Sequence, residues 1–388
     1  MRIRSGRYGR VAALVVAGLL PIVAPAPVSA AAQAPPTAAS LDRALSQFVA
    51  SPGGPPGVAV VIQRGPSMTL QTAGTSMVGT TRSPALNDHM RLASVAKAFS
   101  GAVALSLVHD RLLSLGDTIG RRMPSLPGAW KNVTLTELLN HSSGIPDFTA
   151  SQQFRQALAA APLSAPSPSA LLSYVSAQPL QFKPGSRYEY SNSDNIILGL
   201  MGEAVTGRSY ETLLQDRVYG PFGLAQTSLP RDASISAPLI HGYALEPGHP
   251  PQDVTGVFAA GWAWASGGIV STPGDANTFI RPYVRGTETD AATRAQQFHF
   301  LQNASSEPPG PGTNSAGLGI FRYKTSCGTV YGHTGNTAGY TQFIAATSDG
   351  SRSVTVSASA QINPKSSPKP FALLQKIYGL AVCAALAR

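Results

Sequence analysis

The chain has 388 residues, of which 12% are charged, and it contains 38 Gly and 32 Pro. This length allows one large or two modest domains, and the glycine and proline content predicts long connections. The formal net charge is +10, but the basic residues form no blocks and do not alternate with aromatic residues. Nucleic-acid binding is therefore not expected.

The first thirty residues have the pattern of a secretory signal peptide. The apolar run 11–25 is short and contains two prolines, so a retained membrane anchor is not expected. Small residues at 28–30 offer a cleavage site after Ala30, and no cysteine follows at which a lipid could attach. Four arginines and no acid precede this site, so cleavage leaves a net charge of +6: Arg2, Arg4, Arg7 and Arg10. We therefore expect secretion into the extracellular or cell-wall space.

Strand patterns occur at both ends of the mature chain. Residues 31–40 are expected to be a disordered lead-in, and the β-branched runs 57–65 and 68–74 predict two strands around a Gly-Pro turn. A helix that is apolar on most faces, and so buried, is predicted from Ser94 to about Leu113. Late in the chain, four further strand-like runs precede a final helix: 318–324, 328–333, 341–347, 353–359 and 370–386.

The sequence predicts mainly helices and loops in the middle of the chain. Thr134 and Glu137 form a capping box that opens a short helix, which Gly144 is expected to close. Two long connections are expected at 160–170 and 303–317. The pattern predicts an α+β fold, with an antiparallel sheet built from both chain ends and flanked by helices. We expect one domain over 41–388, with a mostly helical inserted subdomain at about 116–300.

Two cysteines, Cys327 and Cys383, remain in a chain that we expect to be exported. A disulfide between them is the natural interpretation, and two unpaired thiols are the alternative. A loop of this length would contribute about 4 kcal/mol in the chain-entropy model.

A serine and a lysine lie three residues apart in the small, apolar run "RLASVAKAFSG". On a helix, Ser94 and Lys97 would share one face. A lysine made neutral by burial can take the proton of a serine hydroxyl and create a nucleophile. The spacing alone is weak support, because Ser366 and Lys369 repeat it in a proline-rich stretch and an exposed lysine is the commoner case.

Two further motifs could complete a site. In "YEYSNSDN", Tyr190 could relay a proton while Asn192 holds a peptide carbonyl. In "YGHTGNTAGY", His333, Thr334 and Gly335 could line a strand edge beside a substrate. Taken singly, each motif is more often a turn.

The order S-x-x-K, Y-x-N, H-T-G resembles the penicillin-recognising serine hydrolases, the family of class C β-lactamases and D-alanyl-D-alanine carboxypeptidases. Similar stretches include "LTELLNHSSGIPDF", "FKPGSRYEYSN", "VYGPFGLAQTSL" and "ASGGIVSTPGD", so the resemblance covers roughly 41–388. It implies the following roles: Ser94 as acylated nucleophile, Lys97 and Tyr190 as proton-transfer groups, Asn192 as amide-binding residue, His333, Thr334 and Gly335 along the substrate, and the N–H groups of Ser94 and Asn336 as the oxyanion hole. No metal or organic cofactor is implied.

Other assignments are weaker. Ser193-Asp194-Asn195 spells the S-D-N of class A β-lactamases, but the E-x-x-x-N pattern of those enzymes does not follow. His141 could suggest a Ser-His-Asp triad, although a structural role at the end of the capped helix is more plausible. The sequence contains neither G-x-S-x-G nor H-E-x-x-H, which argues against an α/β-hydrolase and a zinc peptidase.

The substrate is expected to be a peptidoglycan stem peptide. H-T-G in place of K-T-G, together with the string "SCGTVYGHTG", resembles exported actinobacterial-type DD-carboxypeptidases. Arg322 could bind a terminal carboxylate, or could simply be solvated. His333 could supply a cation or act as a neutral hydrogen-bond donor. The expected protein is a monomer that also binds β-lactams; a β-lactamase, a small-acyl esterase and a non-turnover penicillin receptor are the alternatives.

Overall fold

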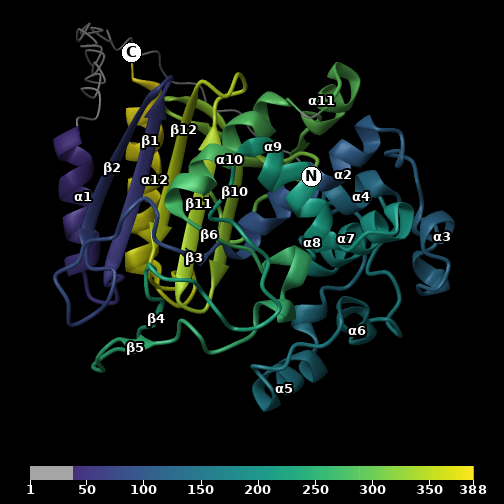
Figure 1. Ribbon diagram of the computed structural model, residues 1–388, viewed down its shortest axis with the longest axis horizontal. Coiled ribbons are helices and arrows are strands. Elements are labelled where there is room, and N and C mark those ends of the chain that lie inside the picture. The colour runs from purple at the N-terminus through teal and green to yellow at the C-terminus, as the bar shows by residue number, and fades with distance from the viewer. Residues whose placement is uncertain (1–37, 288, 388) are drawn as a thin grey trace, which may run out of the picture. The chain divides into compact units, whose positions relative to one another are not determined.

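An eight-stranded antiparallel sheet organises the computed structural model, which describes residues 38–287 and 289–387. The strand order is β2-β1-β12-β11-β10-β9-β8-β7. Because β1 pairs with β12, the first and last strands of the described residues are neighbours (Figure 1), which confirms the predicted α+β sheet built from both chain ends. The strands are β1 (Gly57–Arg64), β2 (Ser67–Gly74), β7 (Leu301–Gln302), β8 (Thr313–Ala316), β9 (Phe321–Thr325), β10 (Gly328–Thr337), β11 (Tyr340–Ala346) and β12 (Arg352–Ala358).

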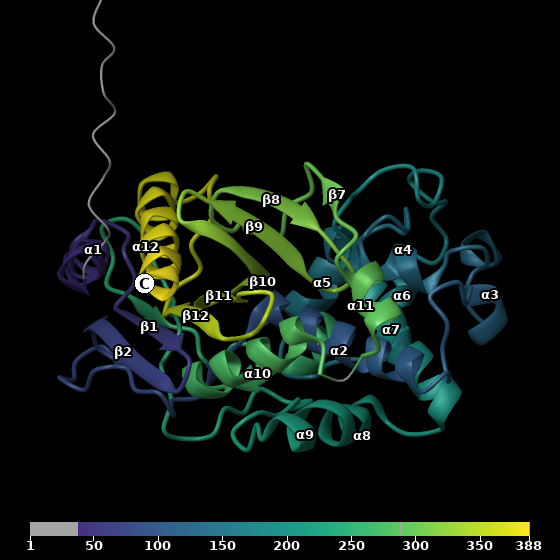
Figure 2. The same cartoon turned by 90° about the horizontal axis from the view of Figure 1, so that it is seen from above.

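Each face of the sheet has its own apolar core. Along β11 the side chains alternate, so that Phe343 and Ala345 join one buried cluster while Ile344 and Ala346 join the other. Helices α1 (Ala38–Ala50) and α12 (Pro368–Leu386) contribute to the first cluster, and α2 (Ala96–His109) and α10 (Pro273–Arg285) to the second. Figure 2 shows α12 and α10 on opposite sides of the sheet. All four core strands β1, β10, β11 and β12 are therefore covered on both faces.

Between α2 and β7 the chain is mostly helical, as the sequence indicates. Among the described helices there, α7 (Asn192–Thr206) is the longest, and it packs beside α2 and α4 (Figure 1). The remaining elements are short: α3 (Ile119–Arg122), α4 (Leu135–Leu139), α5 (Gln152–Ala160), α6 (Pro168–Ser173), α8 (Tyr210–Leu214), α9 (Gly220–Phe222), α11 (Ala291–Gln297), β3 (Met90–Arg91), β4 (Tyr243–Ala244), β5 (Gln252–Asp253) and β6 (Val270–Ser271).

Some predicted boundaries are wrong. The helix that begins beside Ser94 stops at His109, because Arg111 takes a left-handed φ of 60°. The capping box of Thr134 and Glu137 is present, but its helix ends at Leu139, five residues before Gly144. Strand β8 lies inside the expected loop 303–317, where its sequence TNSA has no β-branched alternation. Helix α1 begins at Ala38, within the expected lead-in 31–40, and the predicted signal peptide lies outside the described residues.

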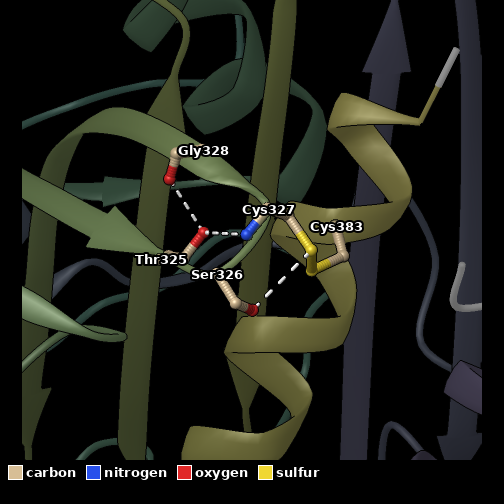
Figure 3. Close-up of a disulfide and its surroundings, with 5 residues drawn as sticks. All are labelled: Thr325, Ser326, Cys327, Gly328 and Cys383. Carbon is tan, nitrogen blue, oxygen red and sulfur yellow. Dashed lines mark hydrogen bonds between the residues drawn. A yellow bond between two sulfur atoms is a disulfide. The ribbon is translucent and has the colours of Figure 1, made fainter. Parts of the chain in front are cut away.

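The predicted disulfide between Cys327 and Cys383 is present (Figure 3). It joins the turn between β9 and β10 to the last turns of α12. By length and composition α12 could cross a membrane, but its residues Leu374, Ile377 and Tyr378 are fully buried against the sheet. In the described part of the chain, α12 is a core helix of the domain.

Candidate active site

Ser94 lies in a tight turn at the start of α2. Residues Ala93–Val95 form a 3₁₀ turn that leads directly into the helix. Ala93 has a left-handed φ of 51°, which is strained for a residue with a side chain. The first N–H groups of a helix have no intrahelical acceptor, so the N–H of Ser94 is available to a ligand. The chain thus presents a hydroxyl and a free N–H at one point.

Lys97 lies one turn into α2, and its side chain is 1% exposed. Its Nζ donates to Ser94 Oγ at 3.1 Å, to Asn192 Oδ1 at 2.7 Å and to the Ser266 carbonyl oxygen at 2.7 Å. Burial lowers the pKa of Lys97 to about 7, against the opposing effect of nearby carboxylates, among them Asp147. A large fraction of Lys97 is therefore neutral near pH 7 and able to accept the Ser94 proton.

The Y-x-N motif immediately precedes and starts α7. Asn192 accepts from Lys97, and its Nδ2 donates to Asp147 Oδ2 at 2.9 Å and to Thr149 Oγ1 at 3.3 Å. The Tyr190 ring centroid lies 5.0 Å from Lys97 Nζ. Burial raises the pKa of Tyr190 well above 10, and a polar contact with Ser94 opposes part of this rise. Tyr190 is therefore a protonated phenol at neutral pH. Within the described residues, its buried hydroxyl forms no hydrogen bond of ordinary geometry.

Strand β10 turns a backbone N–H toward Ser94. A two-residue turn joins β10 to β11, so the flanking pair Thr337 and Tyr340 is hydrogen bonded and the pairs alternate from there. The N–H of Asn336 consequently points away from β11. On its other side, β10 pairs with β9 only as far as Gly332. The N–H of Asn336 therefore faces a free strand edge.

Gly335 allows this edge to approach the nucleophile. A Cβ at Gly335 would lie 2.4 Å from the Leu92 carbonyl oxygen and 3.1 Å from the Ser94 nitrogen. Both atoms belong to the backbone and cannot rotate away. The absence of a side chain at this residue therefore brings the N–H groups of Ser94 and Asn336 close to one another, as an oxyanion hole requires.

His333 and Thr334 lie behind the wall of the site. The His333 ring is 1% exposed, and its Nδ1 contacts the Thr334 carbonyl oxygen at 2.5 Å. Burial, followed by the charge of Lys97, lowers the pKa of His333 to about 3. The imidazole is thus neutral at physiological pH, which favours the neutral hydrogen-bond donor over the cation, the two roles that the sequence left open for His333. The Thr334 hydroxyl donates to the Pro308 carbonyl oxygen at 2.5 Å.

A cleft of about 850 Å³ opens over Ser94. Of the sequence-predicted residues, Ser94, Tyr190, Asn192 and Asn336 line it, Lys97 lies beneath Ser94, and His333, Thr334 and Gly335 lie behind the lining. The other lining residues come mainly from the 303–309 and 361–366 segments: Ala93, Thr149, Tyr188, Ala263, Ser266, Gly267, Asn303, Ser305, Ser306, Glu307, Pro308, Pro309, Thr337, Gln361, Asn363, Pro364, Lys365 and Ser366. In the described part of the chain, no group of three or more His, Cys, Asp or Glu side chains is arranged to hold a metal ion.

The alternative residues have other partners. Ser193 donates to the Pro146 carbonyl oxygen and Asp194 accepts from Ser143, so the S-D-N register is used for packing inside α7. Arg322 donates to Gln302 and Ser315 and does not line the cleft. It therefore does not bind a substrate carboxylate there.

His141 and Ser366 can be judged in the same way. His141 contacts Asp194 at 2.9 Å and is 4% exposed, so no Ser94-His-Asp triad forms. Ser366 lines the cleft, but within residues 38–287 and 289–387 its hydroxyl makes no hydrogen bond to a lysine.

Several contributors are not apparent from motif spacing. Ser266 acts through its backbone carbonyl, which any residue could provide, so no sequence signal exists for it. Asp147 and Thr149 hold the amide of Asn192; Asp147 lies in the "HSSGIPDF" stretch that resembles the family, whereas Thr149 lies just after it and has no sequence signal. Glu307 and Lys365 are charged residues in the cleft lining that the sequence presents only as parts of proline-rich loops.

A serine activated by a buried lysine, facing two backbone N–H groups, is the apparatus of serine hydrolases that form an acyl-enzyme. Residues 41–377 match the model of the family described as Beta-lactamase. The chain belongs to this β-lactamase family of serine hydrolases.

The relatives extend this result. A Salmonella schwarzengrund protein, provisionally named a D-alanyl-D-alanine carboxypeptidase, is 25% identical over 201 residues, which are 50% of this chain and 43% of that protein. The chain thus aligns with less than half the length of this relative. A D-stereospecific amidohydrolase from Streptomyces sp. is 27% identical with a TM-score of 0.74, covering 84% of this chain and 95% of the other. A D-amino acid amidase from Ochrobactrum anthropi, 22% identical with a TM-score of 0.77 over 89% of this chain and 97% of its own, shares the fold.

Proposed function

We propose that the protein is an exported serine D-alanyl-D-alanine carboxypeptidase that acts on peptidoglycan stem peptides through an acyl-enzyme at Ser94. The observation that carries this proposal is the contact between Lys97 Nζ and Ser94 Oγ at 3.1 Å, directly beneath the cleft. Export rests on the signal-peptide pattern of residues 1–30. The name of the Salmonella relatives agrees with this activity.

The proposed reaction uses the groups of the site in the following order. Ser94 Oγ attacks the carbonyl carbon of the penultimate D-residue while neutral Lys97 takes the hydroxyl proton. The N–H groups of Ser94 and Asn336 stabilise the oxyanion as it develops. The C–N bond then breaks, Tyr190 gives its phenolic proton to the leaving amine, and Lys97 returns a proton to Tyr190. Water hydrolyses the ester by the same route in reverse, which releases the acid and restores Ser94.

The leaving group of a carboxypeptidase carries a free carboxylate, which favours a cation in the cleft. Lys365 lines the cleft and is exposed, so it is the residue that we assign to this carboxylate in place of Arg322. Lys365 also lowers the pKa of Glu307, which burial and the charge of Asp147 raise. Both side chains line the same cleft, where each can interact with a charged substrate.

A second candidate is hydrolysis of D-amino acid amides that carry a free amine. Two observations favour it: the 27% identity to the Streptomyces D-stereospecific amidohydrolase, and the carboxylate of Glu307, which makes no hydrogen bond or ion pair within the described residues and could bind an ammonium group. A β-lactamase or esterase would use the same acyl-enzyme, and a penicillin receptor would form it without turnover.

The first test detects the acyl-enzyme. The protein is incubated with a fluorescent penicillin and with an activated thioester, and the adduct is located by peptide mass spectrometry. We expect one adduct at Ser94, its loss in Ser94→Ala, and no change in Ser366→Ala. An adduct at Ser366, or no adduct with either probe, would overturn the proposal.

The second test chooses between the candidates. Release of D-Ala from an acyl-D-Ala-D-Ala peptide is measured beside hydrolysis of its C-terminal amide, of D-Ala amide and of a chromogenic cephalosporin. We expect Lys365→Gln to raise KM about tenfold, and only for the substrate with a free carboxylate. A change of this size is expected because one charge-assisted hydrogen bond is lost. Preference for D-Ala amide, lost in Glu307→Gln, would instead support the amidase.

A further inference from the structure

A buried His–Asp pair lies directly behind Tyr190 and takes no part in the proposed proton transfers. His141 Nδ1 and Asp194 Oδ2 are 2.9 Å apart, and their side chains are 5% and 0% exposed. Ser143 donates to the other oxygen of Asp194 at 2.6 Å. The centroid of the His141 ring lies 4.5 Å from that of Tyr190, with 37° between the planes. The imidazole is therefore in contact with the phenol ring on the side away from solvent.

The backbone around His141 also holds the Tyr190 segment. The Glu189 N–H donates to the His141 carbonyl oxygen at 2.8 Å, and the Gly185 N–H donates to that of Ser142 at 2.8 Å. His141 itself has a left-handed φ of 58°, which costs free energy and persists only where surrounding contacts fix it. His141 thus places its own ring behind Tyr190, and its backbone carbonyl holds the segment that carries Tyr190.

Burial and the charge of Lys97 lower the pKa of His141 to about 3, so the imidazole is neutral at physiological pH and adds no charge to the site. Burial likewise raises the pKa of Asp194 well above its ordinary value. The charges of Lys97 and Asp147 act on the pKa of His141, that of Lys97 acts on His333, and those of Glu307 and Asp147 act on Tyr190. A neutral imidazole among them acts by its shape and its fixed plane.

We propose that His141, held in plane by Asp194, is a positioning residue that fixes the Tyr190 ring against Ser94 and Lys97. The inference rests on the proposed function, because it needs Tyr190 to take part in acylation. Without the imidazole, the phenol ring loses the surface behind it and can move away from the Ser94 hydroxyl. A misplacement of this kind slows a step that depends on near-contact geometry.

The test is a double-mutant cycle between His141 and Tyr190. His141→Asn removes the ring while keeping a residue that tolerates the left-handed φ. We expect the rate of Ser94 labelling by a fluorescent penicillin or an activated thioester to fall roughly 10- to 100-fold. In a Tyr190→Phe background, the same change should cause little further loss, because the two residues act through one step. Asp194→Asn, which keeps the volume, should give a smaller loss with the same dependence on Tyr190.

A matched control is available in the same chain. His241 contacts Asp253 at 2.6 Å and neither residue lines the cleft, so His241→Asn should leave labelling unchanged. Equal losses from His141→Asn with and without the Tyr190 hydroxyl would overturn the inference and show a general structural role. If His141→Asn does not fold, the Asp194→Asn cycle decides by the same criterion. Absence of any Ser94 adduct in the unmodified protein overturns the proposed function, and with it this inference.

Discussion

Lys97 is the residue on which the chemistry of the cleft depends. Three acceptors surround its Nζ, and only one of them, Ser94 Oγ, is the group to be deprotonated. The other two, on Asn192 and Ser266, hold the amine in place whether or not it carries the third proton. The carboxylates of Asp147, Glu307 and Asp194 raise the pKa of Lys97, but burial lowers it more. The amine is thus fixed in position and poised between its two protonation states.

The pH dependence of acylation should report this balance. The usual lysine pKa is 10.5, and in the folded protein it is about 7. Because only the neutral amine accepts a proton, kcat/KM should rise with pH through about 7 and then level off. Tyr190 adds no limb below pH 10, since its pKa lies well above 10. The measurement is kcat/KM against pH on one acyl substrate.

Two results would contradict this account of Lys97. A limb near 10.5 would mean that burial does not control the amine, and a profile flat across neutral pH would mean that Lys97 is not the base. Lys97→Arg serves as the control, because a guanidinium keeps its charge across this range and cannot take the Ser94 proton. It should lose acylation at every pH.

Strand β10 contributes to the sheet core and to the cleft wall at once. Its residues 328–332 pair with β9 and its residues 331–337 pair with β11, so beyond Gly332 the edge that faces away from β11 is unpaired beside Ser94. This arrangement requires Gly335, where a Cβ would lie 2.4 Å from the Leu92 carbonyl oxygen. A single strand thereby links the packing of the sheet to the geometry of the oxyanion hole.

Gly335→Ala should therefore damage both stability and catalysis. The added methyl group must push β10 away from the Leu92–Ser94 backbone, at a cost of about 1–3 kcal/mol in the free energy of unfolding. The displaced N–H of Asn336 should slow acylation roughly 100-fold or more. Denaturant unfolding and stopped-flow labelling measure the two effects. Gly116→Ala is the control, since a Cβ there meets no heavy atom within 4 Å; equal behaviour of the two variants would refute the role of Gly335.

Elements with a strong local pattern could be predicted from the sequence, and those fixed by distant contacts could not. The β-branched run of β1 and the capping box at Thr134 correspond to the observed structure. Strand β8 forms because it pairs with β9, and its sequence TNSA contains no strand pattern from which it could be predicted. The three site motifs pointed to the residues that meet around Ser94. The neutrality of His333 could not be foreseen, because it comes from burial beside Lys97, a tertiary effect.

At the scale of the whole molecule, the two chain ends are joined through the sheet and through a disulfide. Helices α1 and α12 pack against each other and against the strands that they flank in sequence. The mostly helical residues between α2 and β7 are thus inserted in sequence between β1 and β12, two strands that pair with each other in the sheet. Opening either end exposes the core that supports β10. The contacts that hold the sheet together therefore contribute both to the free energy of unfolding and to the position of β10 at the site. Contacts far from Ser94 along the sheet contribute to stability alone.

The disulfide allows these two properties to be separated. Cys327 and Cys383 are 56 residues apart in sequence, and closing such a loop stabilises the fold by about 4 kcal/mol in the chain-entropy model. Cys327 lies at the end of β10 opposite Asn336, about 30 Å away at the usual rise of a strand. Replacement of both cysteines by serine should lower the free energy of unfolding by up to about 4 kcal/mol while leaving Ser94 labelling unchanged well below the melting temperature.

Because Cys327 is exposed, mild reduction of the native protein should give the same result, and peptide mapping without reductant should recover the linked pair. Loss of labelling in a variant that is still folded would show that the strain of the sheet is transmitted along β10 to the oxyanion hole.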